Sequence, residues 1–362
     1  MPGSSNFAQS KTNHLRVHVN WLHLLGVFKD APLFSHSLEG GSLLLAGSMD
    51  SRLRGNDLEF SEQESKPGAV QKSVPLAQPT PSKVRPKVLS SLKKHWPEYI
   101  MEACELGFLA FMACASSALF RHPASPLSHI FDGNGLLQRL AVGLVMGITI
   151  TGIIYSPMGK RSGAHINPAV TFTFLRLGKI GAADGFFYML FQFAGGIAGV
   201  TLAGLTLGSL VAAPEVNFAA TEPGSYGAVV AFFAEMGISA IIMGTVLYVT
   251  NHKRIMHKVG LYVGILYAAY ITLEQPFSGT SMNPARTLGS VLMTGSWAGT
   301  WIYFTAPLMG MLLASEIFLW TKGKDAIHCA KLLHTTDVRR IVRCGWTAFE
   351  DENNSMEENN DS

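Results

Sequence analysis

The distribution of polar and apolar positions divides this chain into three parts. Residues 1–97 and 321–362 are mostly polar, whereas residues 98–320 are dense in Leu, Ile, Val, Ala, Gly and Phe. A bilayer core of about 30 Å is crossed by roughly 20 helical residues. Because backbone groups in lipid must bond internally, each such segment is expected to be a helix. Six segments qualify: 98–120, 136–156, 183–211, 226–250, 258–275 and 301–320.

The two polar parts are expected to be tails. The stretch 61–94 is rich in Pro, Ser, Lys and Gln, a composition that buries too little apolar surface to fold alone. We therefore predict a disordered tail over residues 1–97 and a second tail over residues 321–362, which is acidic at its end. No small-residue cleavage site follows an apolar core near the N-terminus, so no cleaved signal peptide is expected.

The composition narrows the class of protein. With 48% hydrophobic and 15% charged residues, the 362-residue chain is predicted to be an integral membrane protein. A formal net charge of +3 is too small to indicate a nucleic-acid partner. The four cysteines form no CxxC pair, and no phosphate-binding glycine loop or catalytic triad pattern is present. We expect no enzyme activity, no catalytic residues, no metal and no cofactor.

The distribution of basic residues predicts the orientation. An even number of spans places both ends on one side, and positive charge concentrates on the cytoplasmic side. Basic residues flank the expected helices on that side: Arg85, Lys87, Lys93, Lys94, Lys160, Arg161, Arg176, Lys179, Lys253, Arg254, Lys258, Lys322, Lys324 and Lys331. The opposite loops hold Arg121 and Arg139 at helix edges, and otherwise Glu215 and Glu222. Both tails are therefore predicted to be cytoplasmic.

The tripeptide Asn-Pro-Ala occurs twice, at 167–169 and 283–285, and the copies lie 283 − 167 = 116 residues apart. Each opens an apolar segment too short to cross a bilayer. The first follows the second span and the second follows the fifth, so they enter from opposite sides. Three spans and one half-helix are thus repeated in inverted orientation. We predict an all-α membrane protein with six transmembrane helices and two half-spanning helices.

Two further sequence similarities support the repeat. Residues 162–169 align with residues 278–285 without a gap. Glu105-Leu106-Gly107 in the first span is similar to Glu235-Met236-Gly237 in the fourth. Each glutamate is predicted to accept hydrogen bonds from the loop before its half-helix; proton transport is the alternative. His165 is predicted to position its loop, with gating by protonation as the alternative.

The paired motifs suit the middle of a pore. Proline is favoured at the first helical position and asparagine before it is a preferred cap. Two helix N-termini that face each other, each with about half a positive charge, repel cations. The asparagine amides can donate hydrogen bonds to a passing water and interrupt proton hopping. The predicted midplane residues are Asn167, Pro168, Ala169, Asn283, Pro284 and Ala285. Arg286 follows the second motif and is expected near the outer mouth, where its charge faces an aqueous path.

Over residues 98–320 these motifs resemble the aquaporin, or major intrinsic protein, family. The resemblance is carried by Ser-Gly-Ala-His-Ile-Asn-Pro-Ala-Val at 162–170 and Asn-Pro-Ala-Arg at 283–286. Gln192 with Gly195, and Pro307 with Gly310, look like the family's Gln-x-x-Gly and Pro-x-x-Gly. The resemblance implies a right-handed bundle of six helices with two half-helices, one pore per subunit, and a homotetramer.

The residues give opposing indications of the sub-class to which this chain would belong within the family. In glycerol facilitators an Asp follows Asn-Pro-Ala-Arg, but here Thr287 stands there, and Tyr303-Phe304 resembles the aromatic pair of water-selective members. Water-selective members usually have an aromatic residue and a histidine in the outer filter. The corresponding positions here are Met146, with Val145 or Gly147 as alternatives, and Ile271; Thr280 and Arg286 would complete the filter.

The sequence therefore predicts a passive channel for water in the plasma membrane. The less polar filter leaves open a channel for small neutral solutes such as hydrogen peroxide, ammonia, urea or glycerol. Inverted repeats also occur in coupled secondary transporters, but no acidic residue is clearly placed to carry a coupling ion. A structural or adhesion protein is a third class, which the intact pair of motifs disfavours.

Overall fold

The computed structural model describes residues 87–131, 133–334 and 341–342. The chain divides into two units, 1–80 and 81–362, and every described residue belongs to the second. Most of the predicted N-terminal tail, residues 1–86, and the acidic end of the C-terminal tail lie outside the described residues.

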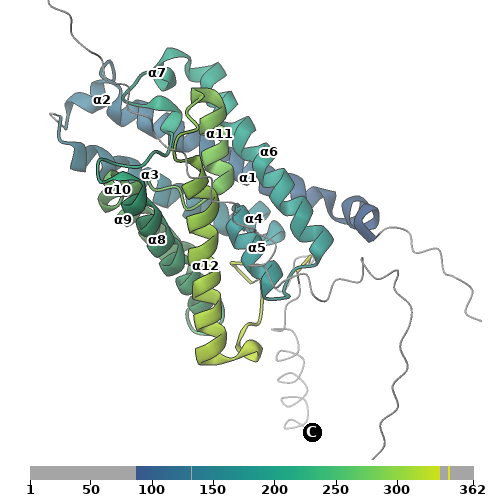
Figure 1. Cartoon of the computed structure of the whole chain (residues 1–362). Helices are drawn as coiled ribbons and strands as arrows, with labels where there is room; N and C mark the ends of the chain where they lie inside the picture. Colours follow the sequence, from purple (N-terminus) through teal and green to yellow (C-terminus); the bar gives the residue numbers. More distant parts are fainter. Residues whose placement is uncertain (1–86, 132, 335–340, 343–362) are drawn as a thin grey trace, which may run out of the picture. The chain divides into compact units, whose positions relative to one another are not determined.

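Six helices are long and apolar enough to cross a membrane, as the sequence predicted (Figure 1). They are α1 (Lys87–Arg121), α3 (Gly135–Tyr155), α6 (Ala182–Leu207), α8 (Gly227–Thr250), α9 (Val259–Leu273) and α12 (Thr300–Lys322). The bounds of the last five agree with the expected spans within a few residues. The prediction of an all-helical membrane protein is confirmed by these helices.

Helix α1 begins earlier than expected, because residues 87–97 were assigned to the tail. The polar start of the helix is fixed by contacts with the first turn of α6. His95 Nδ1 lies 2.8 Å from Asp184 Oδ1, and the Tyr99 hydroxyl donates to the same oxygen at 2.6 Å. These polar contacts extend the helix beyond its apolar part, and an apolar-segment criterion does not detect them.

Two short helices start at the Asn-Pro-Ala motifs: α5 (Pro168–Arg176) and α11 (Pro284–Thr294). With 9 and 11 residues they are about 14 and 17 Å long, or half a bilayer core. Helix α5 packs on α6 and α12, α11 packs on α6, and the two half-helices contact each other. The remaining short helices are α2 (Pro126–His129), α4 (Pro157–Ser162), α7 (Ser209–Ala212) and α10 (Gln275–Ser278).

Glycines let the spanning helices approach closely. A Cβ added to Gly195 on α6 would lie 2.1 Å from the carbonyl oxygen of Ala103 on α1. One added to Gly147 on α3 would lie 2.5 Å from the carbonyl oxygen of Gly264 on α9. The main helix pairs are α1 with α6, α8 with α12, and α3 with α9. Small residues at such crossings are a common feature of membrane helix packing.

The helix contacts also correct the register of the internal repeat. Gly310 on α12 approaches the carbonyl oxygen of Met236 on α8, as Gly195 on α6 approaches that of Ala103 on α1. Met236 therefore corresponds to Ala103, and Glu235 corresponds to Glu102. The expected pairing of Glu105 with Glu235 is wrong by three residues. It was based on a Glu-x-Gly likeness, whereas the helix crossing decides which glutamate faces the loop.

The C-terminal region differs from the predicted tail over residues 327–333. After α12 the chain turns at Lys324–Ala326 and then packs against the helices. Six of the next seven side chains are at most 7% exposed: Ile327, Cys329, Ala330, Lys331, Leu332 and Leu333. The segment is too short and too mixed in polarity to be recognised from its sequence as buried. We call it the 327–333 segment.

Candidate pore

Each half-helix is started by its own asparagine. The Asn167 side-chain oxygen accepts a hydrogen bond from the N–H of Ala169 at 2.9 Å, and α5 follows from Pro168. The Asn283 oxygen accepts from the N–H of Ala285 at 3.0 Å, and α11 follows from Pro284. Capping leaves both side-chain NH2 groups to find other partners.

Those NH2 groups cross between the two halves of the repeat. Asn167 Nδ2 donates to the carbonyl oxygen of Met282 at 2.7 Å, and Asn283 Nδ2 donates to the carbonyl oxygen of Ile166 at 2.7 Å. Each asparagine thus bonds the residue that precedes the other asparagine. An amide nitrogen carries two hydrogens, so each side chain has one further donor to offer. The start of one half-helix is thereby fixed against the start of the other.

The loops before the half-helices share an unusual backbone. Ala164 and Ile166 have φ of 52° and 41°, and Thr280 and Met282, 116 residues later, have φ of 56° and 55°. Left-handed φ values are costly for residues with a Cβ and persist only where the surroundings enforce them. The same two positions are left-handed in both loops, so the internal symmetry extends to the backbone.

Buried carboxylates hold this backbone in place. Glu102 accepts hydrogen bonds from the N–H groups of His165 and Ile166 at 2.9 and 2.6 Å. Glu235 accepts from the N–H groups of Ser281 and Met282 at 2.6 and 2.8 Å. Both glutamates are at most 1% exposed. Glu102 was not singled out in the sequence, although it also lies in an apolar helix, as Glu105 does.

Glu105 binds the same loop differently. It accepts from the hydroxyl of Ser162 at 3.1 and 3.2 Å and from no loop N–H among the described residues. The Tyr188 hydroxyl donates to the Ser162 carbonyl oxygen at 2.6 Å, and Tyr303 does the same to Ser278 at 2.6 Å. These tyrosines occupy equivalent places on α6 and α12. The role of Tyr303 in this chain is therefore to fix the loop before α11.

On one side of the asparagines lies a cavity of about 650 Å³, counting the part open to solvent. We call it the Arg286 cavity. All four predicted filter residues line it together: Met146, Ile271, Thr280 and Arg286. Of the three candidates on α3, Met146 alone is among its lining residues, while Gly147 packs on Gly264 of α9. Asn283 also lines it.

Arg286 and Thr280 differ in what they offer to this cavity. Arg286 Nη1 is buried and has no hydrogen-bond partner among the described residues, so its hydrogens are available to a molecule in the cavity. The Thr280 hydroxyl instead donates to Glu274 Oε2 at 2.5 Å. Glu274 therefore acts on Thr280, and it also accepts a hydrogen bond from the Ser278 hydroxyl. Arg286 is the stronger donor of the pair.

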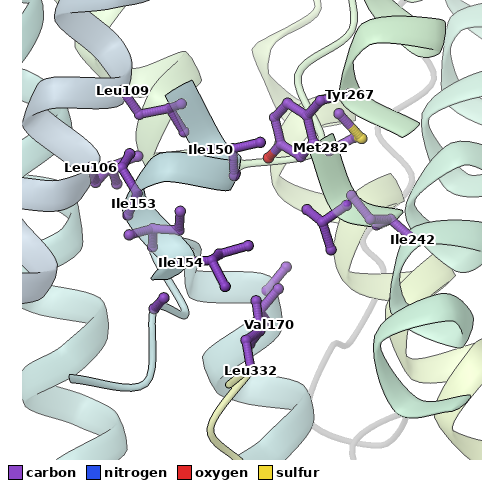
Figure 2. Close-up of a cluster of buried hydrophobic side chains, with 14 of the residues drawn as sticks. Leu106, Leu109, Ile150, Ile153, Ile154, Val170, Ile242, Tyr267, Met282 and Leu332 are labelled. Carbon is purple, nitrogen blue, oxygen red and sulfur yellow. The ribbon is translucent and has the colours of Figure 1, made fainter. Parts of the chain in front are cut away.

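On the other side lies a second cavity of about 410 Å³, again counting the part open to solvent. We call it the His165 cavity. Its wall is largely apolar, with Ile150, Val170, Ile242 and Leu332 among its residues (Figure 2). Asn167 also lines it. Tyr267 and Met282 line both cavities, so they mark the junction between the two.

His165 and Thr287 serve the loops through buried hydrogen bonds. His165 Nδ1 lies 3.1 Å from the Thr171 hydroxyl and Nε2 lies 2.8 Å from the carbonyl oxygen of Ala330. Both ring nitrogens are thus engaged, and the residue is 2% exposed. The Thr287 hydroxyl lies 2.5 Å from that of Ser281 and 2.8 Å from that of Thr221. Thr287 therefore links α11 to its loop.

No group of three or more His, Cys, Asp or Glu side chains that could hold a metal ion occurs in the described ranges. The chemistry of the site is that of donors placed along two cavities that share Tyr267 and Met282 in their walls, within a bundle of spanning helices. Such an arrangement can guide small molecules across a membrane, and its fold and site define the chain as a membrane channel.

Comparison with known proteins agrees with this class. The model of the family described as "Major intrinsic protein" matches residues 89–318. Aquaporin NIP1-1 of Arabidopsis thaliana is 29% identical over 256 residues, covering 68% of this chain and 81% of the relative. The "Glycerol uptake facilitator protein-like 6" of Lactiplantibacillus plantarum is 34% identical over 182 residues, covering 49% of this chain and 82% of the relative.

A solved structure shows the same fold. The X-ray structure of the aquaglyceroporin from Plasmodium falciparum superposes with a TM-score of 0.53 at 20% identity, covering 64% of this chain and 99% of that chain. The chain belongs to the major intrinsic protein family. It is an integral, multi-pass membrane protein and a passive channel rather than an enzyme.

Proposed function

We propose that this channel conducts water through the Arg286 cavity, past the two asparagines, and through the His165 cavity. The observation that carries the proposal is the reciprocal bonding of Asn167 to Met282 and of Asn283 to Ile166 at 2.7 Å. It fixes two amide donors together, with Asn283 in the wall of the Arg286 cavity and Asn167 in the wall of the His165 cavity. Each amide has a second hydrogen that can bond the oxygen of a water molecule.

The same geometry supports exclusion of protons and other cations. The N-termini of α5 and α11 lie beside the asparagines, and a helix N-terminus carries about half a positive charge. A water whose oxygen is held by two amides turns its own hydrogens away from the junction, which interrupts a hydrogen-bonded file. Arg286 adds a full positive charge to the wall of the Arg286 cavity.

A second candidate is the passage of small neutral solutes such as hydrogen peroxide, ammonia, urea or glycerol. The specific observation that favours it is the lining of the Arg286 cavity. Ile271 and Met146 present apolar side chains, and the Thr280 hydroxyl is bonded to Glu274. None of the described residues that line this cavity is a histidine. A less polar wall favours the apolar surface of a solute over water.

We further propose that both termini face the cytoplasm, so the Arg286 cavity opens outward and the His165 cavity opens inward. The support is the concentration of Lys and Arg in the loops on the side of the His165 cavity. Assembly as a homotetramer and residence in the plasma membrane belong to the same proposal. They rest on the resemblance to other members of the family.

The test is stopped-flow light scattering on vesicles that contain the purified protein. One series uses an osmotic shock, and a parallel series uses inward gradients of glycerol, urea and hydrogen peroxide. Fast osmotic shrinkage with slow solute entry supports a water channel. Solute entry as fast as water supports the second candidate. Shrinkage no faster than in protein-free vesicles contradicts the proposed conduction of water.

A further inference from the structure

The 327–333 segment lies across one end of the His165 cavity. On one side the N–H of His328 donates to Asn251 Oδ1, just after α8, at 2.6 Å. On the other side the N–H of Leu332 donates to the carbonyl oxygen of Gly163 at 3.1 Å. Gly163 belongs to the loop before α5, so the segment joins an element of each half of the repeat.

Further bonds hold the middle of the segment. The Ala330 carbonyl oxygen lies 2.8 Å from His165 Nε2. The Lys331 ammonium, 2% exposed, donates to the carbonyl oxygen of Lys160 at 2.9 Å, in the last turn of α4. A cation at the C-terminal end of a helix, bonded to one of its last carbonyls, is favourably placed. Every one of these partners is at the end of the pore that lies away from Arg286.

With its N–H anchored to Gly163, Leu332 places its side chain in the wall of the His165 cavity. It is 5% exposed and lines the cavity with Val170, Ile150 and Ile242. In Figure 2 Leu332 lies beside Val170, while Tyr267 and Met282 lie at the far end of the cluster. An apolar side chain at this place offers no hydrogen bond to a water leaving the pore, so it opposes conduction.

The equivalent place in the other half of the repeat is filled differently. There the loop between α6 and α8 lies over the loop before α11, with the N–H of Gly224 bonded to the carbonyl oxygen of Phe277 at 3.0 Å. That loop is held at both ends by spanning helices. The 327–333 segment follows α12, and no further spanning helix comes after it in the described residues. It can therefore leave its place without unfolding the bundle.

From these contacts we infer that the 327–333 segment is an intramolecular plug: with Leu332 in the His165 cavity the pore is narrowed at its inner end and conducts slowly, and release of the segment widens it. The inference rests on the proposed function for what is conducted, but not for where the segment binds. Asn251, Gly163, His165 and Lys160 form the receptor for the plug.

Two native cysteines allow the binding to be tested without transport. Cys329 lies in the plug and is 1% exposed, and Cys114 lies on α1 and is fully buried. The detergent-solubilised full-length protein is treated with N-ethylmaleimide, and the labelled peptides are quantified by mass spectrometry. We expect both thiols to be protected in the wild type. In Asn251→Ala, which removes one anchor, Cys329 should be labelled about tenfold faster, equivalent to about 1.4 kcal/mol. Cys114 should stay protected, which shows that the bundle remains folded.

Water permeability tests the consequence. Leu332→Ala removes most of the side chain that narrows the His165 cavity, and Asn251→Ala removes an anchor of the plug. Both variants should therefore raise the osmotic permeability per reconstituted protein several-fold. Leu313→Ala is the matched control, because it makes the same change on an exposed apolar position of α12. Wild-type Cys329 that reacts as fast as in denatured protein overturns the inference. So does permeability in both variants equal to that of a wild type that conducts water.

The two measurements separate the inference from the proposed function. If neither wild type nor Leu332→Ala conducts water or solutes, the proposed function fails, and the labelling of Cys329 still decides whether the segment is a bound plug. If water flows equally through wild type and variants, the channel stands and the plug is rejected.

Discussion

The carboxylate of Glu102 on α1 accepts a hydrogen bond from the backbone N–H of Ile166 at 2.6 Å. Ile166 is one of the residues with left-handed φ, and its carbonyl oxygen accepts a hydrogen bond from the side-chain amide of Asn283. A buried carboxyl group thus holds a strained loop in the position that the pore asparagines require. Glu235 and Met282 repeat the relationship in the second half, with a hydrogen bond of 2.8 Å.

The first prediction concerns Glu102 and Glu105 on α1. In Glu102→Gln the new NH2 group must face a donor, since Glu102 accepts from His165, Ile166 and Gln192. Each donor left without an acceptor costs about 1–3 kcal/mol. We expect a lower midpoint of thermal unfolding in detergent. Glu105→Gln is the control, because the amide oxygen can still accept from the Ser162 hydroxyl. Equal losses in both variants contradict the assignment of the loop-holding role to Glu102.

The second prediction concerns the reciprocal asparagines. Asn283→Asp removes the donor to the Ile166 carbonyl oxygen and places a carboxylate beside two helix N-termini. The cap to Ala285 survives, so the protein should fold, with a loss of about 1–3 kcal/mol for the unpaired carbonyl. Water permeability should fall and proton leak should rise. Stopped-flow scattering and a pH-sensitive dye inside the vesicles measure the two effects. Asn167→Asp should behave alike, and a leak-free variant at either position argues against the amides as the barrier.

The sequence predicted the architecture well because bilayer thickness and backbone hydrogen bonding leave few choices. Six apolar segments and two Asn-Pro-Ala motifs were enough to derive six spanning helices, the half-helices and their inverted arrangement. The structure then brings Met146, Ile271, Thr280 and Arg286 around one cavity. That grouping was expected from the resemblance to a family, and local patterns alone do not contain it.

The sequence was a poorer guide wherever tertiary contacts decide. Glu102 and Glu105 both lie in an apolar helix, and only the crossing of α1 with α6 shows which one reaches the loop N–H groups. The 327–333 segment is short and has a lysine and a histidine among its apolar residues, so its composition is typical of a polar tail. Its burial depends on acceptors supplied by Asn251, Gly163 and Lys160, which lie 77 to 171 residues away.

The third prediction concerns the Arg286 cavity. Arg286→Val removes a charge whose Nη1 has no partner among the described residues and also enlarges the cavity. A cation about 7 Å from the guanidinium is raised in energy by roughly 2 kcal/mol at an effective dielectric constant of about 20. Proton leak should therefore rise by about tenfold or more. Urea and glycerol entry should rise as well, measured by the re-swelling of vesicles after the initial shrinkage.

Ile271→His is the counterpart of that variant, because it adds a polar ring to the same wall. Entry of glycerol and urea should fall relative to water. The ratio of solute to water permeability is the quantity to compare across wild type, Arg286→Val and Ile271→His. A ratio that is the same in all three proteins shows that selectivity is not set in the Arg286 cavity.

The last prediction concerns the crossing of α1 and α6. In Gly195→Ala the new Cβ would lie 2.1 Å from the carbonyl oxygen of Ala103, so the helices must separate. Overpacking of this kind costs about 1–3 kcal/mol. Gly237→Ala on α8 is the control, since an added Cβ meets no atom within 4 Å there. The control should be neutral or stabilised by about 0.5–1 kcal/mol, because alanine is the better helix former. Thermal unfolding in detergent measures both variants.

Because Glu102 lies next to Ala103 in the chain, separation of these helices should also withdraw the carboxylate from the His165 and Ile166 N–H groups. Gly195→Ala should therefore lower water permeability as well as stability, whereas Gly237→Ala should leave permeability unchanged; full conduction in a destabilised Gly195→Ala protein would show that the loop keeps its shape without this crossing.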